Sequence, residues 1–580
     1  MSSDGPNQVI RLTGRSLIDG QASGELIFSH VPLSFWGGVS AETGVIVDEH
    51  HPLQGQCVTD RVVAIPAGRG SCSGSGVLLE LLLRKKAPAA FVFQSFDEVL
   101  TLGVVVAKAM FGLSIPVLTV SSDDFLLLQD QSYLTVAGAN LWSGLQTLEP
   151  LAQSRWMNGR NTVKLSAKDR LIVAGEHGKA AQTAMQILLT VAGLQGAEAL
   201  LDVTQAHIDA CVYTGPGGLQ FAERLMAMGG KFAVPTTLNS ISIDSRRWRE
   251  CGIDPIIADQ AQKLADAYMT MGAALSFTCA PYLLESSPKT GENIGWAESN
   301  AVVFANSVLG ARTQKYPDFL DVCIALTGRA PMAGCHLDSN RLPTIEINVV
   351  QVSWVDDSFW PLVGYLVGKL CGPAIPLILG LEHTYPSTSD LKAFGAAFAT
   401  TSSAPMFHIN EVTPESILAV ALKGSIPTTA TVTKQGMRTC WTELNTARAT
   451  SVGLVSLGNP HFSLEEFAQL AQLCSGRNQH PDVQMAITTS RVTYEQAKRA
   501  GHIGTIETFG ARLITDTCWC MLGEPVVPLS ARNLMTNSAK YAHYAPGMVK
   551  RGVRFGSLAA CVEAACNGQD HSAPPHWLTD

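Results

Sequence analysis

The first 140 residues alternate short hydrophobic runs with glycine-rich turns, a pattern typical of strands in a small β/α domain. Six runs have the length and the β-branched or aromatic content of strands: residues 9–12, 24–28, 44–47, 62–65, 90–93 and 115–120. Two longer apolar stretches, 77–86 and 98–111, have the length of helices. We therefore predict a first small domain over residues 1–150.

After residue 166 the pattern changes to long helical stretches separated by short apolar runs that end in Gly, Pro or Asn. The predicted helices cover residues 178–192, 258–271, 416–422, 464–474 and 494–500. Alternation of helix and short strand predicts a large, multilayer α/β domain over residues 166–580. Residues 151–165 join the two as a predicted linker, because residues 153–163 are polar and lack a strong period.

Composition limits the class of protein and its partners. The chain is 46% hydrophobic and only 16% charged, which indicates well-packed domains, and its net charge of −8 includes no basic stripe for nucleic acid. The N-terminus is polar, so we expect no secretory signal there. The apolar run 359–381 is interrupted by Lys, Gly and Pro, so we expect it to be buried and not to span a membrane. We expect a cytoplasmic monomer that binds neither nucleic acid nor a membrane.

The most informative loop covers residues 68–76, between a predicted strand and a predicted buried helix. Unpaired N–H groups at a helix N-terminus hold anions, and the helix dipole favours an alkoxide there. The loop offers three serines beside a cation: Ser71, Ser73, Ser75 and Arg69. A phosphate cradle or a simple tight turn would explain the same residues. The Lys-Ser/Thr ending of nucleotide-binding phosphate loops is missing.

In the larger predicted domain, polar side chains gather where strand-like runs stop. They are Thr236, Thr237, Asn239, Cys279, Glu298, Asn459, His461 and Cys518. The chain has no C-x-x-C pair and no H-E-x-x-H motif, so spacing alone is weak support for a metal. Most of the 14 cysteines are expected to pack in the core. Cys279 and Cys518 stand at strand ends, where loops carry function, so core packing and a functional role explain these two cysteines equally well.

Taken together, these motifs resemble the aconitase X family over nearly the whole chain. The matching segments of the small domain are 37–39, 42–44, 51–53 and 68–75, and those of the large domain are 235–239, 279–282, 296–299, 305–312 and 516–518. The resemblance implies a swivelling small domain followed by an aconitase-like catalytic domain. It also implies an iron–sulfur dehydratase. One branch of the family is a heterodimer acting on mevalonate 5-phosphate, and the other is a fused chain acting on cis-3-hydroxy-L-proline. This chain is fused with the small domain first, so it resembles the second branch.

The resemblance also implies metal ligands. Cys279 and Cys518 match the family's ligand positions, whereas Asn459 stands where the phosphomevalonate branch has a cysteine. Because iron–sulfur clusters are held by cysteine thiolates, the missing thiol implies a smaller centre, a 2Fe–2S cluster or a single iron. Cys323 is the expected third ligand. Cys520, Cys335 and the amide of Asn459 are its rivals.

For cis-3-hydroxy-L-proline, the resemblance implies an anti elimination of water that gives Δ1-pyrroline-2-carboxylate. Ser71 matches the family's base, and an iron centre is the Lewis acid. The other expected substrate contacts are Arg69, Ser73, Thr236, Thr237, Asn239, Glu298 and Lys540. Glu298 could instead be an acid/base group or pair with Arg312. Alternatives are a mevalonate 5-phosphate dehydratase, a non-catalytic imino-acid-binding paralogue and an aconitase-like isomerase.

Overall fold

The structure, a computed structural model, describes residues 10–49, 51–146, 163–352 and 354–579. The chain divides into two compact units. Unit 1 comprises residues 1–201, 214–231 and 316–333, and unit 2 comprises residues 202–213, 232–315 and 334–580. Most of the predicted linker, residues 147–162, lies outside the described residues.

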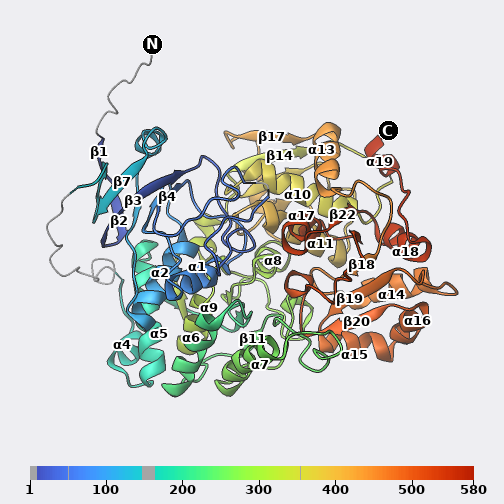
Figure 1. Cartoon of the computed structure of the whole chain (residues 1–580), viewed down its shortest axis with the longest axis horizontal. Helices are drawn as coiled ribbons and strands as arrows, with labels where there is room; N and C mark the ends of the chain where they lie inside the picture. The colour runs from blue at the N-terminus through green and yellow to red at the C-terminus, as the bar shows by residue number, and fades with distance from the viewer. Residues whose placement is uncertain (1–9, 50, 147–162, 353, 580) are drawn as a thin grey trace, which may run out of the picture. The chain divides into compact units, whose positions relative to one another are not determined.

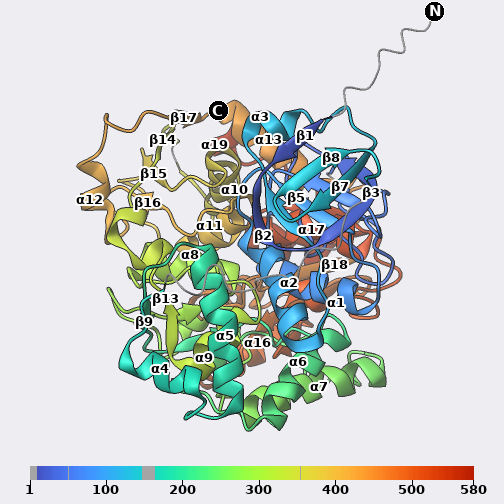
Figure 2. The same cartoon turned by 90° about the vertical axis from the view of Figure 1, so that its left-hand side faces the viewer.

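Unit 1 contains an eight-stranded mixed sheet in the order β1-β8-β7-β3-β4-β5-β6-β2. Strands β3 to β6 run parallel, and β1, β8, β7 and β2 add to them in antiparallel fashion. Figure 2 shows β3, β7 and β8 side by side. The strands are β1 (Arg11–Thr13), β2 (Arg15–Ile18), β3 (Gln21–Phe28), β4 (Val62–Ile65), β5 (Ala90–Phe93), β6 (Val117–Thr119), β7 (Tyr133–Ala137) and β8 (Asn140–Ser143).

Helices complete unit 1. Helices α1 (Gly74–Leu83) and α2 (Glu98–Phe111) connect the parallel strands and pack against each other. Asp97 caps the N-terminus of α2, and Gly112 ends it in the left-handed conformation. The remaining elements are α3 (Ser122–Leu126), α4 (Ala167–Ala174), α5 (Lys179–Leu194), β9 (Leu200–Asp202), α6 (Pro216–Ala227), α9 (Leu320–Thr327) and β13 (Arg329–Pro331).

One predicted strand of unit 1 is wrong. Residues 44–47 form a loop held by single bridges, Val39 with Ile46 and Val45 with Cys57. Ile46 is fully buried and the two valines beside it are half-buried, so the hydrophobic run reflects burial without a strand ladder. The predicted helices at 77–86 and 98–111 are confirmed, with ends shifted by up to three residues.

Unit 2 contains three sheets in which every strand pairing is parallel. Their orders are β11-β10-β12, β16-β15-β14-β17 and β20-β19-β18-β21-β22. Figure 1 shows β18, β19 and β20 among α14, α15, α16 and α18. The strands are β10 (Ala206–Ile208), β11 (Thr236–Leu238), β12 (Gly295–Trp296), β14 (Ile345–Val349), β15 (Pro376–Leu379), β16 (His408–Ile409), β17 (Thr429–Val432), β18 (Leu454–Leu457), β19 (Gln484–Thr489), β20 (Arg512–Thr515), β21 (Asn533–Thr536) and β22 (Gly552–Phe555).

The helices of unit 2 join and cover these strands, as expected for parallel sheets. They are α7 (Pro255–Thr270), α8 (Ser299–Phe304), α10 (Phe359–Cys371), α11 (Thr388–Thr401), α12 (Ser416–Val420), α13 (Lys434–Leu444), α14 (Leu464–Cys474), α15 (Arg491–Arg499), α16 (His502–Phe509), α17 (Ala539–Val549), α18 (Leu558–Asn567) and α19 (His576–Thr579). Short turns of helix cover residues 281–283, 305–309, 334–336, 338–340 and 519–521.

The glycine-rich apolar run that begins at residue 359 is buried inside unit 2, as its sequence predicts. It forms α10, which packs along α11. A Cβ atom at Gly364 would lie 2.4 Å from the carbonyl oxygen of Phe394, and one at Gly368 would lie 2.2 Å from Thr401 Oγ1. Glycine at these positions therefore allows the two helices to approach closely. In the described part of the chain, no helix combines the length and apolarity needed to span a bilayer.

Candidate functional site

Two groups of polar residues are candidates for chemistry, one in each unit. The first is the serine loop of unit 1, which joins β4 to α1. Gly70 has φ +85°, and this left-handed turn brings Ser71 two residues ahead of the helix N-cap, Ser73. The backbone N–H of Ser73 donates to Ser71 Oγ at 3.3 Å. The loop therefore supplies the Ser71 oxygen with an N–H donor beside the positive end of a helix dipole.

Neighbouring side chains hold this loop in place. Asp97 accepts hydrogen bonds from the N–H groups of Gly68 at 2.6 Å and Leu100 at 2.7 Å, which ties the start of the loop to α2. The hydroxyl of Ser75 donates to the Cys72 carbonyl at 3.0 Å. Ser75 therefore fastens the loop, while Ser73 makes no side-chain capping bond to α1.

The predicted cation of the loop is already paired. Arg69 Nη2 lies 2.7 Å from Asp48 Oδ2, and both side chains are largely buried. Its Nε is buried and has no hydrogen-bond partner among the described residues. The charge of Arg69 is thus offset by Asp48.

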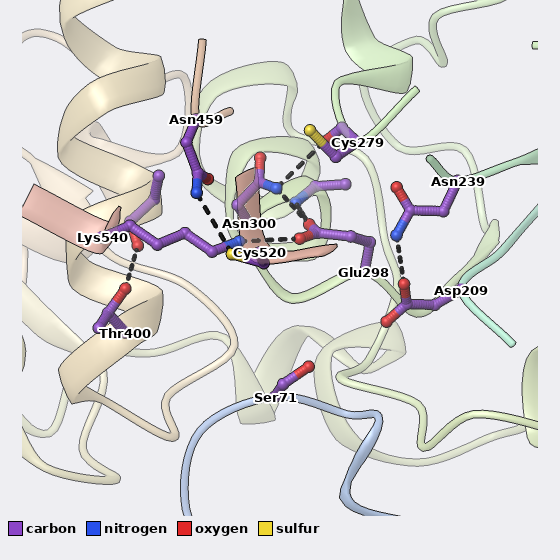
Figure 3. Close-up of polar contacts among 12 residues, drawn as sticks. Ser71, Asp209, Asn239, Cys279, Glu298, Asn300, Thr400, Asn459, Cys520 and Lys540 are labelled. Atoms are coloured by element: carbon purple, nitrogen blue, oxygen red, sulfur yellow. Dashed lines mark hydrogen bonds and ion pairs between the residues drawn. The ribbon is translucent and has the colours of Figure 1, made fainter. Parts of the chain in front are cut away.

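The second group lies in unit 2, where parallel strands end. Such carboxyl edges are the usual ligand sites of α/β sheets. The small sheet contributes Asp209 after β10, Asn239 after β11 and Glu298 after β12. Asn239 Nδ2 donates to Asp209 Oδ1 (Figure 3). Both side chains are buried.

The predicted threonine contacts have intramolecular partners. Thr236 Oγ1 donates to the Val234 carbonyl at 2.8 Å, a turn-capping arrangement. Thr237 Oγ1 lies 2.8 Å from His207 Nδ1, and the His207 side chain is fully buried. Burial lowers the pKa of His207 to about 3, so this imidazole is neutral.

The five-stranded sheet contributes a loop that contacts two cysteine segments. After β18, Asn459 Nδ2 donates to Cys520 Sγ at 3.2 Å, and His461 N donates to Cys279 Sγ at 3.3 Å. His461 Nε2 lies 2.8 Å from the Thr517 carbonyl. The loop at residues 458–461 therefore braces both the segment of Cys279 and the segment of Cys518 and Cys520.

A buried ion pair adjoins these thiols (Figure 3). Lys540 Nζ lies 3.2 Å from Glu298 Oε1, and the two side chains are 16% and 8% exposed. Glu298 Oε2 also accepts from Ala301 N at 2.8 Å, so the carboxylate caps α8. Arg312 pairs with Asp338 instead. Glu298 therefore pairs with Lys540 and not with Arg312, while an acid/base role for Glu298 stays a prediction.

The three thiols have different pKa values. The hydrogen bond from Cys518 lowers the pKa of Cys520 to about 7, and Lys540 and Asn459 act in the same direction against burial. Burial raises the pKa of Cys279, with Cys518 and Glu298 adding to the effect. One thiol of the hydrogen-bonded pair Cys518 and Cys520 is therefore more readily ionised than Cys279.

The other two cysteines considered as ligands lie elsewhere. Cys323 is buried on α9 in unit 1, where burial and then Asp321 raise its pKa. Cys335 belongs to unit 2 but packs in a small cluster with Ile375 and Met406. Its pKa is raised to about 12, mainly by burial.

The donors of this group suit an iron–sulfur centre better than a single metal ion. Within residues 10–49, 51–146, 163–352 and 354–579, no three His, Cys, Asp or Glu side chains surround one point as a single-ion site would require. The donor chemistry does fit an iron–sulfur centre, because Cys279, Cys518 and Cys520 are neighbouring thiols with a buried ammonium that favours thiolates. A cluster spreads its ligands over several irons, so they need not converge on one atom.

Several residues of this group were absent from the predicted set. Asn300 Nδ2 donates to the Cys279 carbonyl at 3.0 Å, and Tyr282 Oη donates to Asn300 Oδ1 at 2.9 Å. Asp209 was also missed, although it follows a short apolar run and its position at a strand end could have indicated it. Nothing in the local sequence marks the Asn300 and Tyr282 pairing.

Comparison with known proteins agrees with this architecture. Family models match residues 11–142 (aconitase X swivel domain), 162–339 (first domain), 343–442 (second domain) and 452–567 (third domain). A crystal structure titled Thermococcus kodakaraensis aconitase X (holo-form) superposes with a TM-score of 0.62 at 30% identity, covering 70% of this chain and 100% of that one. The chain belongs to the aconitase X family.

Curated relatives of this chain include two kinds of dehydratase. The cis-3-hydroxy-L-proline dehydratase of Pseudomonas aeruginosa is 53% identical over 98% of both chains. The enzyme of the same name from Hypocrea jecorina is 51% identical over 98% of this chain and 97% of its own length. The phosphomevalonate dehydratase large subunit of Methanothermobacter thermautotrophicus is 34% identical over 68% of this chain and 96% of its own length. The predicted fold class, a small β/α swivel domain followed by a larger α/β region, is confirmed.

Proposed function

We propose that this chain is a hydro-lyase that converts cis-3-hydroxy-L-proline to Δ1-pyrroline-2-carboxylate. Its resemblance over full length to dehydratases of that name supports the proposal. The observation that carries it is the thiol group Cys279, Cys518 and Cys520, with Asn459 bonded to the last. These thiolates would hold an iron centre, which when bound would supply a Lewis acid for the departing hydroxyl. Cys323, the third ligand expected from the sequence, remains a competing candidate.

The elimination assigns distinct tasks to the chain's own residues. In the cis isomer the C3 hydroxyl and the carboxylate share one ring face, so the C2 hydrogen lies on the other. We assign Ser71 Oγ to take the C2 proton while the C3–O bond breaks and the hydroxyl departs as hydroxide. The proton held by Ser71 then neutralises that hydroxide, so the net loss is one water. The Ser73 N–H and the dipole of α1 stabilise the alkoxide that this requires. The enamine product then tautomerises to the pyrroline.

The remaining contacts position charge around the substrate. The Glu298 carboxylate and the thiols raise the pKa of Lys540 well above its ordinary value against the effect of burial, which keeps the ammonium charged. Lys540 therefore provides a fixed positive charge beside the thiols. Arg69 and Ser73 of the serine loop are proposed substrate contacts. Carboxylate binding by Thr236, Thr237 and Asn239 requires their side chains to exchange the partners they have here.

Product trapping tests the reaction. Iron-reconstituted protein is incubated with cis-3-hydroxy-L-proline, and the pyrroline is trapped with o-aminobenzaldehyde. We expect an adduct from the cis isomer and none from trans-3-hydroxy-L-proline, because the trans isomer would have to lose water in a syn geometry. Mevalonate 5-phosphate is the third arm. Its conversion in place of the cis imino acid would support the alternative dehydratase and overturn this proposal.

A further inference from the structure

Two residues of unit 2 have an unusual backbone conformation at matching places. Phe277 has φ +37° and Asp516 has φ +70°. Non-glycine residues seldom adopt this left-handed region, because the Cβ atom crowds the backbone. Phe277 lies two residues before Cys279, and Asp516 lies two residues before Cys518. The chain therefore turns sharply just ahead of both cysteines, and such turns persist only where the surroundings hold them.

One side chain contacts both turns. Arg491, the first residue of α15, uses Nε and Nη2 to donate to the two carboxylate oxygens of Asp516, each at 2.6 Å. Its guanidinium carbon lies 5.7 Å from the centroid of the Phe277 ring, a cation–π distance. Arg491 thus links the segment that precedes Cys518 to the segment that precedes Cys279.

The same group includes the loop that follows Asn239. Arg491 Nη2 donates to Ser245 Oγ at 2.7 Å, and Asp516 Oδ2 accepts from Ser245 N at 3.1 Å. The Asp516 side chain is fully buried, whereas that of Arg491 is 24% exposed. A buried carboxylate requires such partners, and the two-pronged geometry is available to arginine but not to lysine.

We infer that Arg491 is a positioning residue that fixes the turns at Phe277 and Asp516 and so sets the placement of the Cys279 and Cys518 thiols for the iron centre. The inference rests on the proposed assignment of these two cysteines as ligands. Arg491 acts through the backbone of both segments and needs no contact with substrate. A purely structural ion pair would stabilise unit 2 without affecting these thiols in particular.

The test compares Arg491→Gln and Arg491→Lys with two control variants. Arg329→Gln breaks a more buried ion pair, Arg329 with Asp169 in unit 1, and Arg499→Gln changes an exposed arginine on α15. Three quantities are measured: the melting temperature, the alkylation rates of Cys279 and Cys518 in iron-free protein by peptide mass spectrometry, and the iron and visible spectrum after reconstitution.

We expect Arg491→Gln to weaken iron retention by about 10- to 100-fold, the range for residues that orient metal ligands, and to speed alkylation of both cysteines. Arg491→Lys should retain more iron than Arg491→Gln but less than wild type, because lysine keeps the positive charge but cannot donate to both carboxylate oxygens in the same geometry. Arg329→Gln should lower the melting temperature yet leave iron per folded chain and both alkylation rates unchanged. Arg499→Gln should match wild type throughout.

Phe277→Leu keeps the test decisive if Arg491→Gln does not fold. This change preserves apolar burial and removes the ring, so alkylation of Cys279 should speed up more than that of Cys518. Wild-type iron content and thiol reactivity in folded Arg491→Gln, or in Phe277→Leu, would overturn the inference. Wild-type protein that binds iron but does not convert cis-3-hydroxy-L-proline would refute the proposed substrate and leave the positioning role of Arg491 standing.

Discussion

The side-chain amide of Asn459 donates a hydrogen bond to the sulfur of Cys520 across 3.2 Å. Asn459 follows β18 and Cys520 follows β20, so the bond joins two strand ends of one sheet. A cysteine in place of Asn459 would add a thiol to the group, whereas asparagine adds only a donor that stabilises a neighbouring thiolate. Asn459 therefore supports the ionised form of Cys520 instead of binding metal through sulfur.

Replacing this donor tests its importance. Asn459→Asp keeps the size of the side chain but exchanges the N–H donor for an oxygen that repels the Cys520 thiolate. We expect dehydratase activity and iron retention to fall by about 10- to 100-fold, as for other partners of metal ligands. The matched control is Asn478→Asp, an exposed position with the same change of charge. Equal iron content and activity in both variants would refute the role of Asn459.

Ser71→Ala tests the proposed base. A general base contributes about 10²- to 10⁴-fold to rate, so kcat should fall by at least that lower factor while iron content stays at the wild-type level. Ser122→Ala, which removes a hydroxyl at the exposed start of α3, serves as control. Turnover of Ser71→Ala within tenfold of wild type would remove Ser71 from the role.

The strand–turn–helix around Ser71 could be predicted from the sequence, because its signals are local. A buried strand, a run of small residues and an apolar helix follow one another within 22 residues, and each element forms as expected. The sequence pattern does not predict β7 and β8. They pair with each other locally, but their places in the sheet also depend on β3 and β1, more than a hundred residues away.

The contacts of the candidate site were harder to predict. Cys279, Glu298 and Cys518 could be proposed because they stand at strand ends or match family motifs. The pairing of Lys540 with Glu298 joins residues 242 positions apart, and the link from Arg491 to Asp516 depends on how two parallel strands lie. These pairings follow from tertiary packing. The local sequence around a charged residue does not show whether it is paired in the interior or exposed at the surface.

The Lys540–Glu298 pair leads to a prediction about stability. Lys540→Met leaves the buried Glu298 carboxylate without its ammonium, and breaking a buried pair in this way costs about 3–5 kcal/mol. The double variant Lys540→Met with Glu298→Gln should lose less, because no unpaired charge remains and the amide oxygen can still cap α8. Denaturant unfolding followed by fluorescence measures both. A double variant no more stable than the single would contradict this view of the pair.

Asp357 predicts a pH dependence that is independent of the thiols. Burial, with a smaller contribution from Asp356 and Asp390, raises the pKa of Asp357 to about 7, although the Leu558 N–H opposes the shift. Between about pH 4 and pH 7 the folded chain therefore holds a proton that the unfolded chain has released. Unfolding free energy should fall as pH rises through this window, by at most about 1.4 kcal/mol per pH unit from this group.

Asp357→Asn isolates that contribution, because the amide oxygen can still accept from Leu558 N without titrating. The variant should show a flatter loss of stability from about pH 4 to pH 7 than wild type, with both measured by denaturant unfolding in matched buffers. Parallel curves for the two proteins would show that Asp357 is ionised in the folded state throughout this range.

The account depends most on where the iron centre is bound. The decisive measurement is iron and acid-labile sulfide per chain, after anaerobic reconstitution, in wild type and in single Cys→Ser variants at positions 279, 518, 520 and 323. We predict that the first three variants lose most of the iron and sulfide and that Cys323→Ser keeps the wild-type amount. Full iron and sulfide in the first three, or their loss in Cys323→Ser with retention in Cys520→Ser, would contradict the proposed set of ligands.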